Sequence, residues 1–306
     1  MIVRPRPGLL ALLFALRGSV LPQIAPRVVG VAAVACLSVA GERAWPEHFP
    51  MAAGVAPFTV LGLALSIFLS FRNSACYDRW WEARKAWGGL IVEMRGLARL
   101  TVTLLPDPDL APCRRRLLHR AIGFAYALNA RLRERDEAGA AAPWLPPDEA
   151  AGLTGRVNPT DAVLTGLAAE IAALRRRGAL SDILYGDFAA RLAAMAAIQA
   201  TCERIRRTPL PFAYTLLVHR TAWLYCLLLP FGLAGSLGWF TPVAAAVVAY
   251  TFFGLDALGD ELEEPFGTDP NDLPIDALAR LIETELRDVL GEPLPPPPVP
   301  DRFVLR

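Results

Sequence analysis

Long uncharged stretches dominate the pattern of hydrophobic and polar positions along this chain. Residues 51–71 contain no charged side chain, and their 21 positions match the length that an α-helix needs to cross the hydrocarbon core of a bilayer. Residues 221–255 are uncharged for 35 positions, which is too long for one crossing. Two glycines and a proline between residues 235 and 242 predict a break near the middle, so we expect a helical hairpin there.

Another span is predicted closer to the N-terminus. Residues 28–41 form an uncharged run of 14 positions between Arg27 and Glu42, which is short for a crossing. The run becomes long enough if it recruits residues 20–26 and if the Arg27 side chain extends to the membrane surface. The chain therefore contains four predicted spans.

The four spans divide the chain into five parts. We expect an N-terminal interfacial helix in residues 1–19, spans 1 and 2 in 20–71, a helical cytoplasmic domain in 72–220, spans 3 and 4 in 221–255, and a C-terminal cytoplasmic helical segment with a proline-rich tail in 256–306. An interfacial helix is preferred to a signal peptide because the first apolar run ends at Arg17 without a small-residue cleavage pattern. Helical spacing of apolar positions, without β-type alternation, predicts an all-α integral membrane protein.

The distribution of charge predicts the orientation of the spans. The loop at residues 42–50 carries one arginine against two glutamates, and the tip of the hairpin carries no charge. Basic residues instead precede the first span, follow the second and precede the third, where they include Arg4, Arg6, Arg17, Arg72, Arg79, Arg84, Lys85, Arg95, Arg204, Arg206, Arg207 and Arg220. The positive-inside rule then places both termini in the cytoplasm.

Composition and motifs exclude several functional classes. The 31 basic and 30 acidic residues give a formal net charge of +1, so there is no excess of positive charge to favour nucleic-acid binding. The five cysteines are widely spaced and lie near no histidine that completes a zinc site. The chain has no GxSxG, Walker or HExxH motif, and we do not expect an enzyme.

The end of the second span carries a stripe of large apolar residues. Leu63, Ile67 and Phe71 are spaced by four and therefore share one helical face. From spacing alone, lipid contact or helix packing is favoured over a pore lining. The charged and tryptophan-rich residues 72–88 that follow are equally typical of a membrane-interface belt with internal ion pairs.

Three blocks of sequence resemble the bestrophin family, particularly its bacterial members. They are residues 72–88, residues 203–214 with a Thr-Pro-x-Pro element, and residues 263–274 with an acidic Pro-Phe-Gly element. The blocks occur in the order that the family has, and the resemblance extends over nearly the whole chain. Together they are specific, although each alone is weak.

The resemblance implies a homopentamer of four-span subunits around one pore, in the lipid bilayer of a bacterial inner membrane. By position, the hydrophobic neck of that pore corresponds to Leu63, Ile67 and Phe71, and a second, cytoplasmic constriction corresponds to Ile183. On its own residues, Ile183 reads as an ordinary core isoleucine, and nothing in the spacing specifies five subunits. The family implies passive conduction of monovalent ions, with chloride indicated by the family name and cations by some bacterial members.

Calcium is a separate question raised by the same resemblance. Eukaryotic bestrophins hold calcium in an acidic cluster after Pro-Phe-Gly, and Asp269 and Asp272 match two of its positions, with Pro270 and Asn271 interrupting the cluster. This predicts at most a weak calcium site and no required cofactor. The alternative, which we favour, is that these side chains cap the helix expected to begin near Pro274.

Two other classes of function remain as alternatives. A membrane carrier or enzyme would need buried ionisable groups in its spans or a catalytic cleft, and the uncharged stretches supply no such groups. An accessory or scaffold membrane protein would bind a partner through its cytoplasmic helices. The channel is the function that we predict.

Overall fold

The computed structural model describes residues 1–4, 8, 10–11, 15–48 and 56–305. These residues form helices joined by short turns, and among them β-pairing is limited to two isolated bridges near the chain ends. The chain divides into two compact units. The apolar unit comprises Arg4–Trp80 and Pro209–Pro265, and the charged unit comprises Met1–Val3, Trp81–Thr208 and Phe266–Arg306.

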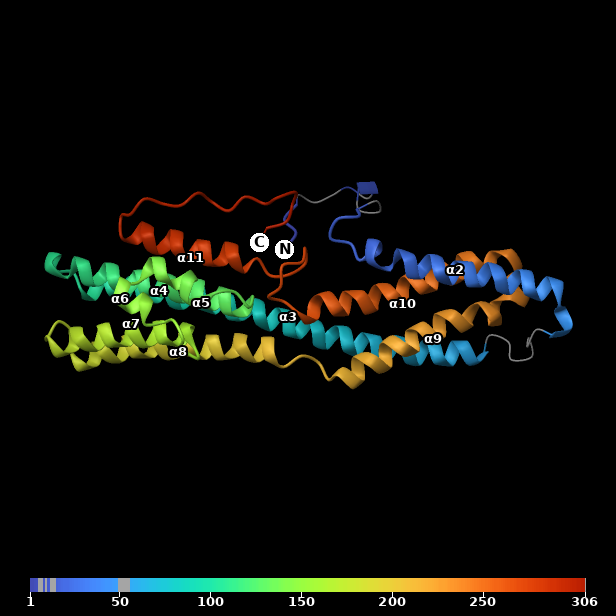
Figure 1. Cartoon of the computed structure of the whole chain (residues 1–306), viewed down its shortest axis with the longest axis horizontal. Coiled ribbons are helices and arrows are strands. Elements are labelled where there is room, and N and C mark those ends of the chain that lie inside the picture. Colours follow the sequence, from blue (N-terminus) through green and yellow to red (C-terminus); the bar gives the residue numbers. More distant parts are fainter. Residues whose placement is uncertain (5–7, 9, 12–14, 49–55, 306) are drawn as a thin grey trace. The chain divides into compact units, whose positions relative to one another are not determined.

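Helices α2, α9 and α10 and the first part of α3 make up the apolar unit (Figure 1). Their bounds are α2 Leu21–Ala44, α3 Ala56–Leu104, α9 Phe212–Leu237 and α10 Thr241–Glu263, with the 3-10 turns η1 (Pro46–His48) and η5 (Gly238–Phe240). Helix α2 starts at Leu21, so the residues before Arg27 are helical and lengthen the uncharged run, as predicted. Residues 5–7, 9 and 12–14 of the predicted N-terminal helix, and residues 51–55 of the second predicted span, lie outside the described residues.

Within the part of the chain that the structure describes, three helical stretches are long and apolar enough to cross a membrane, namely Leu21–Ala44, Ala56–Leu104 and Phe212–Glu263. The last is interrupted at η5, where Gly238 has φ +51°, a left-handed conformation that glycine adopts without strain. Helices α9 and α10 therefore contact each other as a hairpin, as the sequence predicted.

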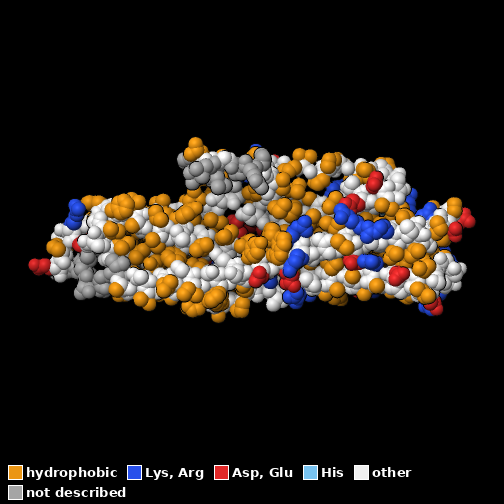
Figure 2. Space-filling view, turned by 180° about the vertical axis from the view of Figure 1, so that it is seen from behind, with side chains coloured by type: hydrophobic (Ala, Val, Ile, Leu, Met, Phe, Trp, Pro, Cys, Tyr) orange, Lys and Arg blue, Asp and Glu red, His pale blue; other side chains and the backbone are white. Residues whose placement is uncertain are grey.

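Apolar side chains from all four helices form the core of this unit. Its buried members include Ile24, Val31 and Ala35 of α2, Leu65 and Leu69 of α3, Ala222 and Cys226 of α9, and Ala249 and Phe253 of α10. Many large apolar side chains nevertheless remain on the outside of the same helices. Figure 2 shows hydrophobic side chains over most of the visible surface of this unit. A surface of this kind is typical of contact with lipid or with other protein.

The charged unit packs several helices around α4. Its elements are the end of α3, η3 (Pro108–Leu110), α4 (Ala111–Leu132), α5 (Glu137–Ala141), η4 (Ala142–Trp144), α6 (Pro147–Ala151), α7 (Pro159–Arg176), α8 (Asp182–Arg207) and α11 (Ile275–Val289). Helix α4 is buried along most of its length, with α7 and α11 against it and α8 against α7. The helical character predicted for this part of the chain is present.

The proline-rich tail after α11 has no helix, as expected for consecutive prolines. At its end, the tail pairs with the N-terminus of the chain. The Met1 amino group donates to the Leu305 carbonyl at 2.6 Å, the Leu305 N–H donates to the Met1 carbonyl at 2.9 Å, and Ile2 and Val304 form an antiparallel bridge. No pattern along the chain indicated this pairing.

Candidate functional site

The predicted neck residues lie on one exposed face of α3. The side chains of Leu63, Ile67 and Phe71 are 65%, 47% and 65% exposed, whereas Leu65 and Leu69 on the opposite face are buried in the core. An α-helix in this register turns one face to its own subunit and leaves the other free. The free face is apolar, so it needs a cover of lipid or of further protein.

Close packing fixes this part of α3 against α9. A Cβ atom added to Gly62 would lie 2.6 Å from the Tyr225 hydroxyl, and one added to Gly232 would lie 2.5 Å from the Phe58 ring. Only glycine allows the helices this proximity, which is a common device in membrane helix packing. The Tyr214 hydroxyl also donates to the Phe68 carbonyl at 2.8 Å.

A buried arginine follows the apolar stripe directly. The Arg72 guanidinium is fully buried and donates to Asp256 Oδ1 at 3.0 Å and to Asp260 Oδ1 at 2.5 Å, while Glu263 Oε2 lies 3.5 Å away. Asp256 is 1% exposed and Asp260 is about half exposed. Charges removed from water need partners of opposite sign, and three carboxylates of α10 supply them here.

Asp256 also joins a histidine and a tryptophan of α9. His219 Nδ1 lies 2.7 Å from Asp256 Oδ2, and the Trp223 indole N–H donates to His219 Nε2 at 3.1 Å. Because Nε2 accepts from the indole, the hydrogen on the imidazole belongs on Nδ1, facing the carboxylate. His219 therefore has a positioning role in the packing of α9 on α10.

Glu263 connects the three family-like blocks of the sequence. Its side-chain Oε1 accepts from the backbone N–H of Leu210 at 3.0 Å, and its carbonyl accepts from Arg79 Nε at 2.6 Å. The Arg72 and Arg79 block, the Pro-Leu-Pro element and the acidic end of α10 thus meet at one place in the apolar unit. The sequence allowed each block to be identified but did not predict that the three converge. The presence of arginines in one block and carboxylates in another was a signal that the blocks could pair.

Ile183 lies in the first turn of α8, with its side chain 83% exposed. The Ser181 hydroxyl caps this helix by accepting from the Leu184 N–H at 3.3 Å. The interpretation of Ile183 as a core isoleucine is therefore wrong for the single subunit. An exposed apolar side chain at a capped helix start is available to line a constriction.

The predicted capping of α11 by Asp269, Asn271 and Asp272 is also wrong. Pro274 occupies the N-cap position and no side chain caps the helix. Instead, Asp272 Oδ2 accepts from the backbone N–H of Asp269 at 2.7 Å, which closes a tight turn before the helix. Two prolines in residues 270–274 keep this segment out of helical conformation, so the aspartates lie too early to reach the orphan amides of α11.

The same geometry fits calcium poorly. Burial raises the pKa of the Asp272 carboxyl to about 6, and Asp269 adds to this while its N–H and Arg133 oppose it. Calcium takes six to eight oxygen ligands, preferably ionised carboxylates. Within the described residues no three His, Cys, Asp or Glu side chains are grouped to hold a metal ion. We derive no role for calcium from this segment.

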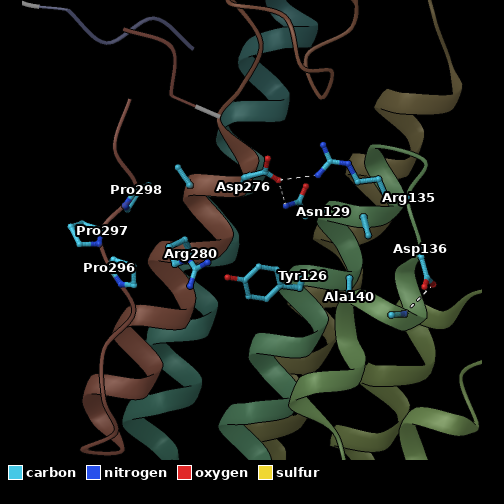
Figure 3. A pocket seen from close by; sticks show the side chains of 13 residues that line it. Tyr126, Asn129, Arg135, Asp136, Ala140, Asp276, Arg280, Pro296, Pro297 and Pro298 are labelled. Carbon is cyan, nitrogen blue, oxygen red and sulfur yellow. Dashed lines mark hydrogen bonds and ion pairs between the residues drawn. The ribbon is translucent and has the colours of Figure 1, made fainter. Parts of the chain in front are cut away.

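A cavity of about 690 Å³ lies in the charged unit between α4, α5, α11 and the proline-rich tail (Figure 3). Asp276 projects into it and is held by Asn129 Nδ2 at 2.7 Å and by Arg133. The Tyr126 hydroxyl donates to Glu283, and burial with this bond raises the pKa of Tyr126. These groups satisfy one another, as in a structural network, and do not form a nucleophile with its base.

Comparison with known proteins relates the whole chain to one family. The family described as Bacterial/Fungal Bestrophin protein matches residues 1–288. The Voltage-dependent anion channel-forming protein mll4386 of Mesorhizobium japonicum is 48% identical over 295 residues, which cover 96% of this chain and 94% of that protein. The Voltage-dependent anion channel-forming protein YneE of Escherichia coli K12 is 40% identical over 303 residues, covering 99% and 98%.

Solved structures agree with this relationship. The bacterial bestrophin homolog from Klebsiella pneumoniae superposes with a TM-score of 0.84 at 37% sequence identity, over 88% of this chain and 99% of that one. The similarity therefore covers the helical arrangement as well as the sequence, and the resemblance recognised from the three blocks is confirmed.

Proposed function

The chain belongs to the bacterial and fungal bestrophin family, and on this basis we propose that it forms a channel that conducts monovalent ions passively across a membrane. The observation that carries the proposal is the uncharged, exposed stripe Leu63, Ile67 and Phe71 on α3. It lies on a helix that is long and apolar enough to cross a bilayer. Relatives over nearly the full length are named as channel-forming proteins.

The stripe supplies a pore only if several copies assemble. We propose four spans per subunit, namely α2, the first part of α3, α9 and α10, and a homopentamer in which the stripes of five α3 helices face a common axis. A ring of Leu63, Ile67 and Phe71 would form a narrow apolar neck, where conduction depends on whether water fills the constriction. Ile183, exposed at the start of α8, would form a second, cytoplasmic ring.

We further propose a bacterial inner-membrane location with both termini in the cytoplasm. The arginines around the predicted spans support this orientation through the positive-inside rule, and an even number of spans puts both ends of the chain on one side. Pairing of Met1 with Leu305 supports it as well, because paired termini share a side.

Calcium is not required in this proposal. Asp272 Oδ2 is already engaged by the Asp269 N–H, and within the described residues no group of three His, Cys, Asp or Glu side chains surrounds it to complete a metal site. Open probability should therefore be the same in a calcium chelator and in micromolar calcium. A steep increase with calcium, lost in Asp269→Asn and Asp272→Asn, would restore the calcium site.

Planar-bilayer recording of the purified protein tests the channel directly. Wild type should give currents that are absent from empty vesicles, and Ile67→Ala should raise the unitary conductance because it widens the apolar neck. Mass measurement in detergent should give five times the mass of one chain. Absence of current from both proteins would favour a carrier or an accessory protein, and unchanged conductance in Ile67→Ala would contradict the neck assignment.

A further inference from the structure

Asp78 continues the neck face of α3 toward the charged end of the helix. It follows Phe71 by seven residues, which is about 20° short of two full turns at 3.6 residues per turn, so both side chains point to the same side. The rise over seven residues is about 10 Å. Phe71 and Asp78 belong to the same compact unit, so this register does not depend on how the two units are placed.

Asp78 differs from the other charged side chains in this part of α3. Between Ala56 and Trp80 the charged residues are Arg72, Asp78 and Arg79. Arg72 is buried among the carboxylates of α10, and Arg79 donates to the Glu263 carbonyl. Asp78 is exposed and has neither a hydrogen bond nor an ion pair with any residue that the structure describes.

From this placement we propose that Asp78 lines the ion pathway beyond the apolar neck and biases permeation toward cations. The inference rests on the proposed channel and extends it to ion selectivity. In a symmetric assembly each subunit contributes one Asp78 carboxylate to a ring around the axis. Rings of carboxylates attract cations and repel anions, whereas an apolar neck by itself chooses neither sign.

The inference opposes the most direct extrapolation from the relatives. Their names specify anions, yet the first free charge beyond the neck face of this chain is negative. The ring acts through a water-filled pathway, so its effect should be stronger at low ionic strength, where the screening length is longer. The placement of Asp78 therefore predicts a preference for cations over anions.

Reversal potentials under a sodium chloride gradient test the inference. The reversal potential of the wild-type current should lie closer to the equilibrium potential of sodium than to that of chloride. Asp78→Asn, which keeps the shape of the side chain, should lower the sodium-to-chloride permeability ratio several-fold, and Asp78→Lys should lower it further. Asp78→Glu should retain the wild-type preference. Asp109→Asn makes the same change of charge at an exposed position on η3 and should leave the ratio unchanged.

The outcomes separate this inference from the proposed function. An unchanged ratio in Asp78→Asn and Asp78→Lys, in proteins that conduct and in which Ile67→Ala alters conductance, would overturn the role of Asp78 and leave the channel standing. Loss of assembly in Asp78→Asn with an unchanged ratio in the remaining channels would assign Asp78 to a subunit contact and overturn the inference. No current from wild type or Ile67→Ala would overturn both.

Discussion

Arg72 is the residue on which the end of the apolar stripe depends. Its guanidinium is completely buried beside Asp256, and the two residues directly follow the uncharged stretches 51–71 and 221–255. Such a pair is weak evidence for added stability, because burial of each charge offsets much of the attraction. Breaking it is different, since the remaining partner becomes a buried charge without compensation.

We predict that Arg72→Ala destabilises the protein strongly, by about 3–5 kcal/mol. Among the described residues Asp256 would keep His219 as its one side-chain partner, and Glu263 would lose one of the groups that hold it beside Leu210. The measurement is thermal unfolding of the purified protein in detergent. Arg175→Ala is the control, because Arg175 and Asp182 form an exposed pair whose loss should change the Tm little. Equal Tm values for the two variants would contradict the structural role of Arg72.

A second prediction concerns Asp272 and pH. Burial raises the pKa of this carboxyl to about 6 in the folded protein, above its value of about 4 in an unfolded chain. The folded state therefore binds more protons in this interval, and the stabilising contribution is complete below the unfolded pKa and is lost as the pH rises through about 6.

The Tm in a chelating buffer should thus rise as the pH is lowered through 6, and Asp272→Asn should flatten this part of the profile. The asparagine amide oxygen can still accept from the Asp269 N–H, so the turn should persist. Asp109→Asn serves as the control at an exposed position. An identical pH profile in wild type and Asp272→Asn would show that this carboxyl is not the group that titrates.

At the scale of elements, glycines at the contact between α3 and α9 set the position of the neck helix. Tyr225, which faces Gly62, is held by edge-on contacts with Phe58 and Phe252, so its ring has little freedom to move aside. Gly62→Ala should therefore push the helices apart and cost about 1–3 kcal/mol through overpacking. Thermal unfolding measures the cost, and a change of unitary conductance would show that the neck has shifted.

Gly30 provides the matched control for this substitution. It lies within α2, and beyond its chain neighbours and the local helix backbone no described atom lies within 4 Å of the position where its Cβ would be. Gly30→Ala should be neutral or slightly stabilising, because alanine is preferred to glycine inside helices by roughly 0.5–1 kcal/mol. If Gly30→Ala lowered the Tm as much as Gly62→Ala, contact with Tyr225 would not be the cause.

Helix α3 also shows what hydropathy could and could not predict. The apolar run to residue 71 was evident, but the helix continues without interruption to Leu104. Residues 72–87 contain no glycine or proline and therefore no reason for the backbone to break. A change of polarity marks where a membrane ends, whereas helix ends depend on caps and breakers. The break between α9 and α10 was predictable because glycine supplied that signal.

The backbone also overrode residue type at the starts of α8 and α11. From its own residue type Ile183 would be core, because isoleucine is usually buried, whereas the constriction that the family resemblance implies needs an exposed side chain; the Ile183 side chain is 83% exposed. Asp269 and Asp272 are of a residue type that often caps helices, yet Pro270 and Pro274 keep this segment out of helical conformation and α11 starts only at Ile275. Residue type predicted burial in one case and helix capping in the other, and in both cases the conformation of the neighbouring backbone prevented it.

For the whole molecule, contacts between distant segments were beyond reach of the sequence pattern. The meeting of Arg72, Arg79, Leu210 and Glu263 joins residues separated by up to 191 positions. The pairing of Met1 with Leu305 joins the two ends of the chain. The family resemblance predicted the helical architecture in which these contacts form. Periodicity and composition predicted only local structure and gave no information on contacts between distant segments.

The central claim is that the Leu63, Ile67 and Phe71 face of α3 lines an ion pathway. Ile67→Cys, recorded in a bilayer before and after a charged, membrane-impermeant thiol reagent, tests it most directly. Phe68→Cys is the matched control, since Phe68 is similarly exposed on α3 but lies about 100° around the helix. Wild type controls for the five native cysteines. The account predicts that the reagent alters the current of Ile67→Cys and leaves that of Phe68→Cys and wild type unchanged. Equal effects on Ile67→Cys and Phe68→Cys, or no effect on Ile67→Cys, would contradict it.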